Sequence, residues 1–551
     1  ASTAGGSGGP SPRASTAKAG RLLATGAALV CAIGCLSAVT APKASASWTE
    51  EVIVTTNGIL SPVQAVLDVG GSVLTRFHLI NGVVASILTI TEPALAGLPG
   101  VQVTPDLSVS IGSAAESDGP HAPSDAFLAE TGATQLAAAG DTGQGVTVAV
   151  LDTGIDNRPD FSGRLVGGVD LTGGNNPFQD SYGHGTFVAG LIAGNGVSSN
   201  GQYSGEAPGA NLVSIKVAGA TGSTDLATLI SGLQWAADNR GAYGIKVLNI
   251  SLGVQAGEST LINPLDQAVE AVWNSGIAVV AAAGNAGPFN GTILSPGDDP
   301  LVITAGALDD RATPSASDDV MANFSSAGPT SPDGWVKPDL VTSGRSVVSL
   351  AAPGSTVYDS YPSARVGQAN FVGSGTSFSA AIVSGAAALV LADNPGLTPD
   401  QIKARLLGTT NPGPVGNPFT DGHGALNAAA AAQSGPMNFA QSVTGLVPVP
   451  PGATVPLSPG GPAGTWNASL WTGLNLSDPP GGQSWSGWDW DGSDWNGWAW
   501  TGKAWNNDGW AGAAWNGQDW SGKAWNNDGW AGSAWAGSAW DGGVWNGSSW
   551  N

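Results

Sequence analysis

The stretch "VTVAVLD" at residues 146–152 decides the fold of the central part of this chain. It is apolar and mostly β-branched up to its last residue, which is typical of a strand buried on both faces. Similar runs follow at 211–217, 246–253, 277–285 and 301–308, and segments of helical length separate them, at 187–194, 224–239 and 261–276. Continuous apolar strands that alternate with helices predict an α/β fold with a parallel sheet covered on both faces.

Two polar side chains stand where such strands end. Asp152 closes the first strand and opens the turn "TGID", and Asn285 closes the run at 277–285. Functional groups gather at the carboxyl ends of parallel strands, where a carboxylate can orient a base and an amide can bind an oxyanion. The alternative is that Asp152 and Asn285 only form turns.

A further candidate is Ser377 in "NFVGSGTSFSAAIVSGAAALVLA", residues 370–392. We expect a turn at Gly373 and Gly375, a helix cap at Thr376 and a buried helix of small residues. That interpretation does not explain Ser377, because a hydroxyl in the first turn of a buried helix needs a hydrogen-bond partner or a function. A helix N-terminus offers unpaired N–H groups and the positive end of the dipole, which suits a nucleophile that creates an oxyanion.

A serine nucleophile needs a base, and the chain has four histidines: His78, His121, His184 and His423. His184 lies in "DSYGHGTFVAGLIAG", between two glycines and before a helix. The others lie in a small N-terminal unit, in a polar link and in a turn. Elimination therefore favours His184 as the base, although a lone histidine is more often structural.

The stretches "LDTGID", "GHGTFVAG", "NISLG", "AAAGN" and "GTSFSAAIVSGAAALV" together resemble the subtilisin-like serine peptidases, in that family's order Asp, His, Ser. The resemblance covers roughly residues 125–433. It implies a serine endopeptidase that acts through an acyl-enzyme, with Asp152, His184 and Ser377 as the triad. It also implies an oxyanion site at Asn285 and the Ser377 backbone N–H, and substrate-binding residues Ser251, Leu252, Gly253, Ala283 and Gly284.

The sequence departs from the family pattern at a few positions. Ala381 and Ile382 stand where the family usually has Pro-His, and Phe187 stands where a second histidine is common. The interval between Asn285 and Ser377 is longer than in short subtilisins, which predicts a surface insertion at 309–319 or 360–368. The chemistry requires no cofactor. Family members often bind structural calcium, but no ligand set is evident in this sequence.

The first 46 residues have the pattern of a secretory signal. Lys18 and Arg21 precede an apolar run over 22–39, and Ala44-Ser45-Ala46 follows. We expect cleavage after Ala46 and a secreted or cell-surface protein; the alternatives are a membrane anchor or a lipid on Cys35. Because Cys31 and Cys35 both lie in this segment, the mature chain would have no disulfide and no catalytic thiol.

Residues 47–120 are predicted to form a separate α+β domain, because strand-like and short helical segments alternate over 50–109 before the polar link "SAAESDGPHAPSD". This part resembles the inhibitory propeptide of the family, which implies that the protein's own propeptide is one of its partners. The peptidase domain then spans 121–433.

A Pro/Gly-rich linker is predicted at 434–484, followed by Trp-rich repeats at 485–551. Tryptophan occupies every fifth position from 485 to 550, and "GKAWNNDGWAG" occurs twice, at 502–512 and 522–532. Such repeats predict a stacked or solenoid-like architecture, or else a disordered array. The tryptophans could bind cell-wall glycan or bury one another.

The charge composition limits the classes of molecule that the protein can bind. With 18 Lys and Arg against 41 Asp and Glu, the formal net charge is -23, which argues against nucleic acid. Two functions compete: an endopeptidase that cleaves proteins or peptides, and a surface or glycan-binding protein that acts through its Trp-rich tail and has a secondary or idle peptidase domain.

Overall fold

The computed structural model describes residues 49–58, 60–111 and 123–435, and the backbone of short strands between 454 and 540. The chain divides into two compact units, Ala1–Ser47 and Trp48–Asn551, and all described residues belong to the second. The predicted signal region, His121 and most of the predicted linker lie outside the described residues.

The central sheet is parallel, in the order β7-β8-β6-β10-β12-β14. Strand β16 also pairs with β14 in parallel, and the short β15 pairs with it antiparallel. The strands are β6 (Thr147–Asp152), β7 (Leu165–Asp170), β8 (Asn211–Lys216), β10 (Ile245–Ile250), β12 (Ala278–Ala282), β14 (Ile303–Asp309), β15 (Val320–Met321) and β16 (Leu340–Ser343). The predicted α/β fold is confirmed, and the apolar runs are the buried strands.

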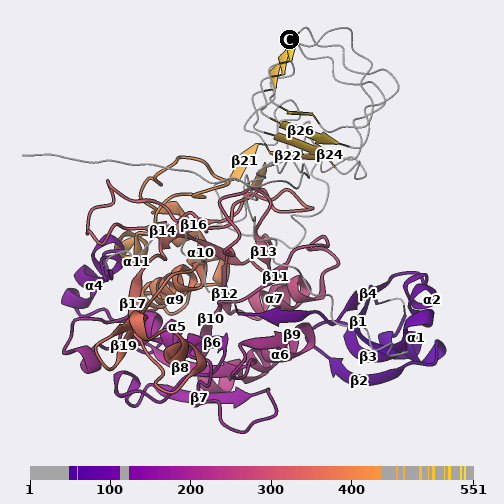
Figure 1. Cartoon of the computed structure of the whole chain (residues 1–551), viewed down its shortest axis with the longest axis horizontal. Helices are drawn as coiled ribbons and strands as arrows, with labels where there is room; N and C mark the ends of the chain where they lie inside the picture. The colour runs from indigo at the N-terminus through magenta and orange to yellow at the C-terminus, as the bar shows by residue number, and fades with distance from the viewer. Residues whose placement is uncertain are drawn as a thin grey trace, which may run out of the picture. The chain divides into compact units, whose positions relative to one another are not determined.

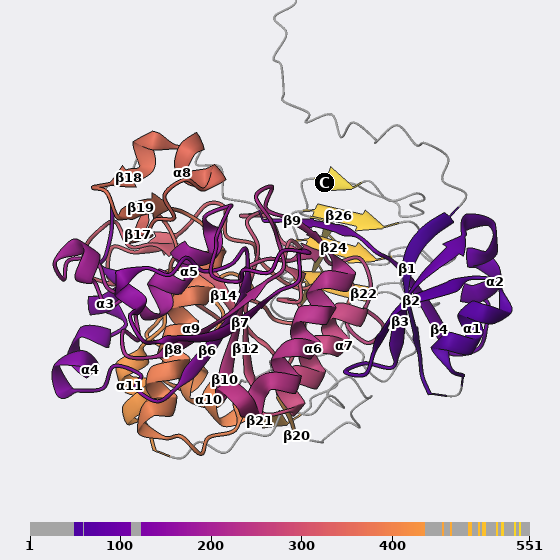
Figure 2. The ribbon, with the colours of Figure 1, turned by 90° about the horizontal axis from the view of Figure 1, so that it is seen from below.

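Helices cover both faces of this sheet (Figures 1 and 2). Helices α5 (His184–Ala193) and α9 (Thr376–Asp393) pack together on one face, and α6 (Leu226–Tyr243) and α7 (Pro264–Asn274) pack together on the other. Helix α9 is long and apolar enough to span a membrane, but 89% of its apolar window is buried in the protein. It is therefore the core helix of the domain.

Helix α9 begins differently from the sequence-based expectation. Its N-cap is Gly375, and Thr376 is its first helical residue, so the predicted cap at Thr376 is wrong. Gly373 is the last residue of β19 (Asn370–Gly373) and not part of a turn. The Thr376 hydroxyl is used instead in contacts with the neighbouring strand end, described below. In contrast, helix α10 (Pro399–Gly408) begins with a capping box, in which the Thr398 hydroxyl accepts from Gln401 N and the Gln401 side chain accepts from Thr398 N.

The remaining elements surround the sheet. Strands β17 (Val347–Leu350), β19 and β18 (Arg365–Val366) form a small antiparallel sheet beside helix α8 (Thr356–Ser360), as Figure 2 shows. The others are α3 (Phe127–Glu130), α4 (Ala133–Ala139), α11 (Ala428–Gln433), β9 (Ser223–Asp225), β11 (Val254–Gln255), β13 (Leu294–Ser295) and the 3-10 turns η2 (Pro159–Phe161), η3 (Val197–Ser199) and η4 (Pro362–Ala364).

A buried ion cluster lies at one end of β14. Lys403 of α10 is fully buried, and its Nζ donates to the carbonyl oxygens of three consecutive residues, 300–302, at 2.8–3.2 Å. Asp339 lies 3.3 Å from Lys403 Nζ and 2.7 Å from the buried Lys337 Nζ. The carbonyls and the carboxylate replace the hydration that the two ammonium groups lose on burial.

The N-terminal part forms a four-stranded antiparallel sheet in the order β2-β3-β1-β4, with two helices packed against it. Its elements are β1 (Thr49–Thr56), α1 (Pro62–Asp68), β2 (Ser72–Phe77), β3 (Gly82–Leu88), η1 (Thr89–Thr91), α2 (Glu92–Ala96) and β4 (Val101–Pro105). Val52 and Val54 belong to the small core beneath the helices, whereas Ile53 belongs to the large core of the chain. Both faces of β1 are therefore buried.

Short strands are present along the Trp-rich segment. Strand β26 (Asp519–Gly522) pairs in parallel with β24 (Ala499–Gly502) and with β28 (Ala539–Trp540). Paired residues are 20 positions apart in the chain, as in Trp500↔Trp520↔Trp540. Strands β23 (Asp494–Trp495), β25 (Ala514–Trp515) and β27 (Ala534–Trp535) follow the same spacing. Strands β20 (Thr454–Pro456) and β21 (Ala463–Thr465) lie in the predicted linker, and β22 (Gln483–Ser486) spans its boundary with the Trp-rich segment.

Candidate active site

Asp152 and His184 meet at the carboxyl end of β6. His184 Nδ1 lies 2.9 Å from both carboxylate oxygens of Asp152, and both side chains are buried. His184 is the first residue of α5, and Gly183 before it has φ +109°. A Cβ on Gly185 would collide with the carbonyl oxygen of Gly154, so only glycine lets the helix approach the end of β6 this closely.

A second acid holds the turn that carries His184, and the sequence did not reveal it. Asp180 Oδ1 accepts from Gly183 N at 2.7 Å, and Oδ2 accepts from Thr186 N at 2.8 Å. The Thr153 hydroxyl donates to Asp180 and accepts from Gly185 N at 2.9 Å, which links the turn to the residue after Asp152. An acid four residues before His184, at the start of a helix, was the available indication.

The electrostatics of His184 favour its charged form. Burial lowers the pKa of the imidazole, but the charge and the hydrogen bond of Asp152, with a contribution from Asp180, outweigh burial and raise the pKa of His184 above its ordinary value. The Asp152 bond at Nδ1 directs the other ring nitrogen, Nε2, away from the carboxylate. Nε2 is therefore the atom that can exchange a proton with a neighbouring group.

Ser377 lies in the first turn of α9, and the ring centroid of the next residue, Phe378, is 5.7 Å from that of His184. Ser377 Oγ donates to the carbonyl oxygen of Ser251 at 2.9 Å, and Ser251 Oγ donates to the carbonyl oxygen of Ser377 at 2.8 Å. In the described part of the chain no hydrogen bond joins Ser377 to His184. Such bonds are often long before substrate binds, and rotation of the hydroxyl changes its partner.

Asn285 is fixed beside the start of α9. Its Oδ1 accepts from the backbone N–H of Thr376 at 2.9 Å and from the Thr376 hydroxyl at 3.0 Å. The same hydroxyl accepts from Gly284 N at 3.0 Å. Because the amide oxygen is held by Thr376, the amide nitrogen Nδ2 is directed to the other side, as a donor for an oxyanion would have to be.

The predicted substrate-binding residues lie around this point. Ser251 and Leu252 follow β10, and Gly253 precedes β11, which pairs antiparallel with β13. A Cβ on Gly253 would lie 2.6 Å from the carbonyl oxygen of Ser295, so this segment runs close to the neighbouring chain. Ala283 accepts from Leu294 N at 3.0 Å, and Gly284 accepts from Ser326 N at 2.9 Å. The segments that carry both groups of residues are thus held by backbone hydrogen bonds.

The other two described histidines lie elsewhere. His78 Nε2 contacts Asp238 of α6 at 2.8 Å, and burial lowers the pKa of His423. Within residues 49–58, 60–111 and 123–435, no group of three or more histidines, cysteines or acids is arranged to hold a metal ion. The expectation of structural calcium therefore has no ligand set in these ranges and stays a prediction.

Comparison with known proteins gives a direct assignment. Residues 143–424 match the profile of the subtilase family, Peptidase S8. The chain belongs to the subtilase family. It is similar to the serine protease AprX of Bacillus subtilis, with 44% identity over 292 residues, which are 52% of this chain and 66% of AprX. It is also similar to subtilisin DY of Bacillus licheniformis, with 36% identity over 55% of this chain and 96% of that protein. This subtilase is a serine endopeptidase.

The departures of this subtilase from the family pattern lie in packing positions. The Phe187 ring packs against Phe378, with centroids 4.3 Å apart, and Ala381 and Ile382 are fully buried in the core. Both segments predicted as insertions are largely exposed, at 309–319 and 360–368. The departures therefore leave the contacts of Asp152 and Asn285 intact.

Proposed function

We propose that this subtilase hydrolyses peptide bonds through Asp152, His184 and Ser377, with Asn285 as an oxyanion donor. The observation that carries the proposal is the bond from Asp152 to His184 Nδ1, which leaves Nε2 for proton transfer beside the first turn of α9. The Asn285 amide is tied to the residue before Ser377, which supports its role as a fixed donor.

The proposed reaction needs only these groups. His184 Nε2 accepts the Ser377 proton while Oγ bonds to the substrate carbonyl carbon, and the oxyanion is held by Asn285 Nδ2 and the Ser377 N–H. His184 then gives the proton to the leaving nitrogen as the C–N bond breaks. Water, with His184 again as base, releases the acyl group from Ser377. Asp152 orients the imidazole and balances its charge.

Residues 47–120 are proposed to act as an inhibitory propeptide. The last described strand of this segment, β5 (Ser108–Ser110), pairs antiparallel with β9, and Ile111 N continues the ladder by donating to Gly222 O at 2.8 Å. An added strand at a sheet edge is how extended peptides are commonly bound. Tyr182, two residues before His184, donates from its hydroxyl to Ile111 O at 3.1 Å. The described part of the segment thus reaches the turn that precedes the proposed base.

Side-chain contacts from the N-terminal sheet support the same proposal. The Gln234 side chain accepts from His78 N at 2.8 Å, and Thr104 donates to Glu258 at 3.2 Å. Asp106 accepts from Ala227 N at the start of α6, at 3.0 Å. These polar contacts add to an apolar contact, because Ile53, Phe77 and Ile80 of this domain belong to the same hydrophobic cluster as the peptidase core.

We further propose that the protein is secreted and that its Trp-rich tail contacts cell-wall or other glycan. The signal-like pattern of residues 1–46 supports secretion, and the regular tryptophans offer flat apolar faces that stack on sugar rings. The alternative, a surface protein with an idle peptidase domain, predicts that Ser377 is unreactive.

The test is reaction of the purified full chain with a fluorophosphonate, beside the Ser377→Ala variant, with the mass of each product recorded. We expect labelling of the wild type alone, on a chain shortened to begin after residue 109. A folded wild-type chain that is not labelled would refute the proposed nucleophile. Binding of the secreted protein to cell-wall glycan, compared with a chain that ends at residue 484, separately tests the tail.

A further inference from the structure

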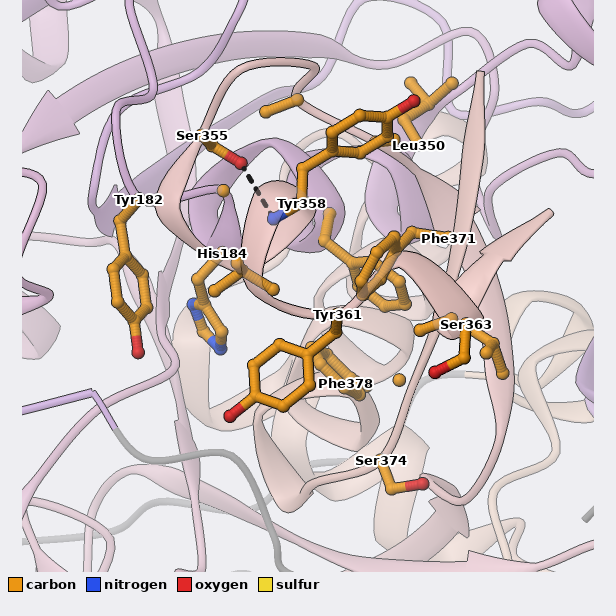
Figure 3. A pocket seen from close by; sticks show the side chains of 18 of the residues that line it. Tyr182, His184, Leu350, Ser355, Tyr358, Tyr361, Ser363, Phe371, Ser374 and Phe378 are labelled. Carbon is orange, nitrogen blue, oxygen red and sulfur yellow. Dashed lines mark hydrogen bonds between the residues drawn. The ribbon is translucent and has the colours of Figure 1, made fainter. Parts of the chain in front are cut away.

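A large cavity opens against the imidazole of His184 (Figure 3). Its volume is about 710 Å³, which is within the range of pockets that bury small ligands. The side chains that give it its apolar character are Phe187, Leu350, Tyr358, Tyr361, Phe371 and Phe378. None of the predicted substrate-binding residues and neither Asn285 nor Ser377 lines it. The cavity therefore shares His184 with the site described above but is lined by a different set of residues.

One segment of the chain, from β17 to β19, builds most of this cavity. Its helix α8 is joined to the turn before His184, because Thr356 N donates to Ser181 O at 3.0 Å and Val357 N donates to Tyr182 O at 2.9 Å. A Cβ on Gly183 would collide with the Ser355 hydroxyl, so the two segments are in close contact. The wall of the cavity and the imidazole are thus positioned by the same hydrogen bonds.

The aromatic wall is held from outside. The Arg365 guanidinium carbon lies 4.0 Å from the centre of the Tyr358 ring, and Arg365 Nη2 donates to Tyr358 O at 2.8 Å. Phe371 and Phe378 are buried, whereas Tyr361 is 56% exposed and lies at the rim. Figure 3 shows the rings of Tyr361, Phe371 and Phe378 turned toward the same space beside His184.

The chemistry of the lining selects an uncharged, bulky group. Among the described lining residues, none is Asp, Glu, Lys or Arg, and the polar groups are hydroxyls and the imidazole. Gly373 also lines the cavity, and a Cβ there would lie 2.8 Å from the Phe378 ring and 3.3 Å from the Phe187 ring. The absence of a side chain at Gly373 therefore keeps this space open between the rings. A charged side chain would lose its hydration there without gaining a partner.

The position of the cavity relative to the reaction follows from the task of His184. The base that accepts the serine proton later donates it to the leaving nitrogen, so the leaving part of the substrate must pass over the imidazole. The part before the scissile bond is expected at β9 and Ser251–Gly253. These elements are different from the β17–β19 segment that forms the aromatic wall.

We propose that this cavity binds a large apolar or aromatic side chain of the residue that directly follows the scissile bond, and that it makes the enzyme selective for such residues. The inference rests on the proposed triad, because it uses His184 as the group that faces the leaving nitrogen. Substrates of this class are peptides with Phe, Tyr or Leu at that position.

The test uses quenched fluorescent peptides that are identical except for the residue after the scissile bond. We expect kcat/KM for Phe to exceed that for Ala or Asp roughly tenfold or more, because a filled apolar pocket discriminates by about that factor. In Ala364→Trp, a substitution of a lining residue, we expect this Phe-to-Ala ratio to fall below about threefold. The ratio is compared within each variant, so a change in overall activity cancels.

A matched variant on the same segment completes the design. Gln368→Trp adds the same ring at an exposed position outside the lining, and we expect it to keep the wild-type ratio. Equal kcat/KM for Phe and Ala in the wild type would overturn the inference. Selectivity that follows a residue before the scissile bond would also overturn it. Ile111 makes this the main competing outcome, because it lines the cavity and continues the β5 strand along β9. Failure of fluorophosphonate labelling would instead refute the proposed triad.

Discussion

The two sides of the His184–Ser377 site are built from different kinds of residues. On one side, small residues at the ends of β10 and β12 are tied together by hydrogen bonds, such as those of Asn285 with Thr376 and of Ser251 with Ser377. On the other side, aromatic rings of the β17–β19 segment enclose an apolar cavity. Stabilising a developing charge needs donors that do not move, whereas selecting a side chain needs mainly space of the right polarity.

The largest effect is expected from a change at Asp152, because this residue contacts His184, which belongs to both sides of the site. Asp152→Asn keeps the size of the side chain but removes its charge, and we expect kcat to fall by roughly 10⁴. Asp152 helps to raise the pKa of His184, so the acid limb of the pH–rate profile should move to lower pH in the variant. The selectivity for the residue after the scissile bond should not change. An acid limb that stays in place would contradict the assigned role of Asp152.

A smaller effect is expected from a change at Asn285, which lies on the hydrogen-bonded side of the site and does not line the cavity. Asn285→Ala removes the proposed oxyanion donor, and we expect kcat to fall by about 10²–10³ with little change in KM. The loss should be the same for peptides with Phe or Ala after the scissile bond, because the cavity is untouched. Asn285→Asp serves as a second variant that keeps the acceptor for Thr376 but not the donor. If it retained wild-type kcat, the donor role would be wrong.

The smallest effect on activity is expected from a group beneath both sides. Glu206 is buried against Gly385 of α9, and its carboxylate accepts a hydrogen bond from the Thr131 hydroxyl at 3.0 Å. Burial raises the pKa of Glu206 to about 8, from 4.5 for an ordinary glutamate. The folded state therefore holds a proton that the unfolded state loses, and stability should fall as the pH rises from about 4.5 to 8.

The substitution Glu206→Gln should abolish this dependence, because glutamine stays neutral and can still accept from Thr131. Both proteins carry Ser377→Ala, which prevents self-digestion. At pH 4.5 we expect the free energy of unfolding in urea to be the same with and without Glu206→Gln. At pH 9 the protein with Glu206→Gln should be more stable than its parent by roughly 1–3 kcal/mol. Equal stability at both values of pH would show that Glu206 is not held neutral in the fold.

The sequence was sufficient for the parts that depend on local pattern. Apolar runs predicted the strands of the sheet, and strand ends and glycines indicated Asp152 and His184, which the structure brings into contact. Asp180 and the aromatic cavity were not predicted, because both depend on which distant segments approach the His184 turn. Thr376 was misassigned as a cap for the same reason: its hydroxyl is engaged by Gly284 and Asn285, 92 and 91 residues away.

The buried ion cluster around Lys403 has a consequence for how the domain tolerates its surroundings. Three consecutive carbonyls and Asp339 form a cage of oxygens, and the ammonium group inside it is covalently part of α10. Burial lowers the pKa of Lys403 to about 7, and the charge of Asp339 opposes this shift. An amino group tethered in this way cannot be diluted away or extracted by a chelator. The order of residues 300–302, which lead directly into β14, therefore does not require a metal ion taken up from the medium.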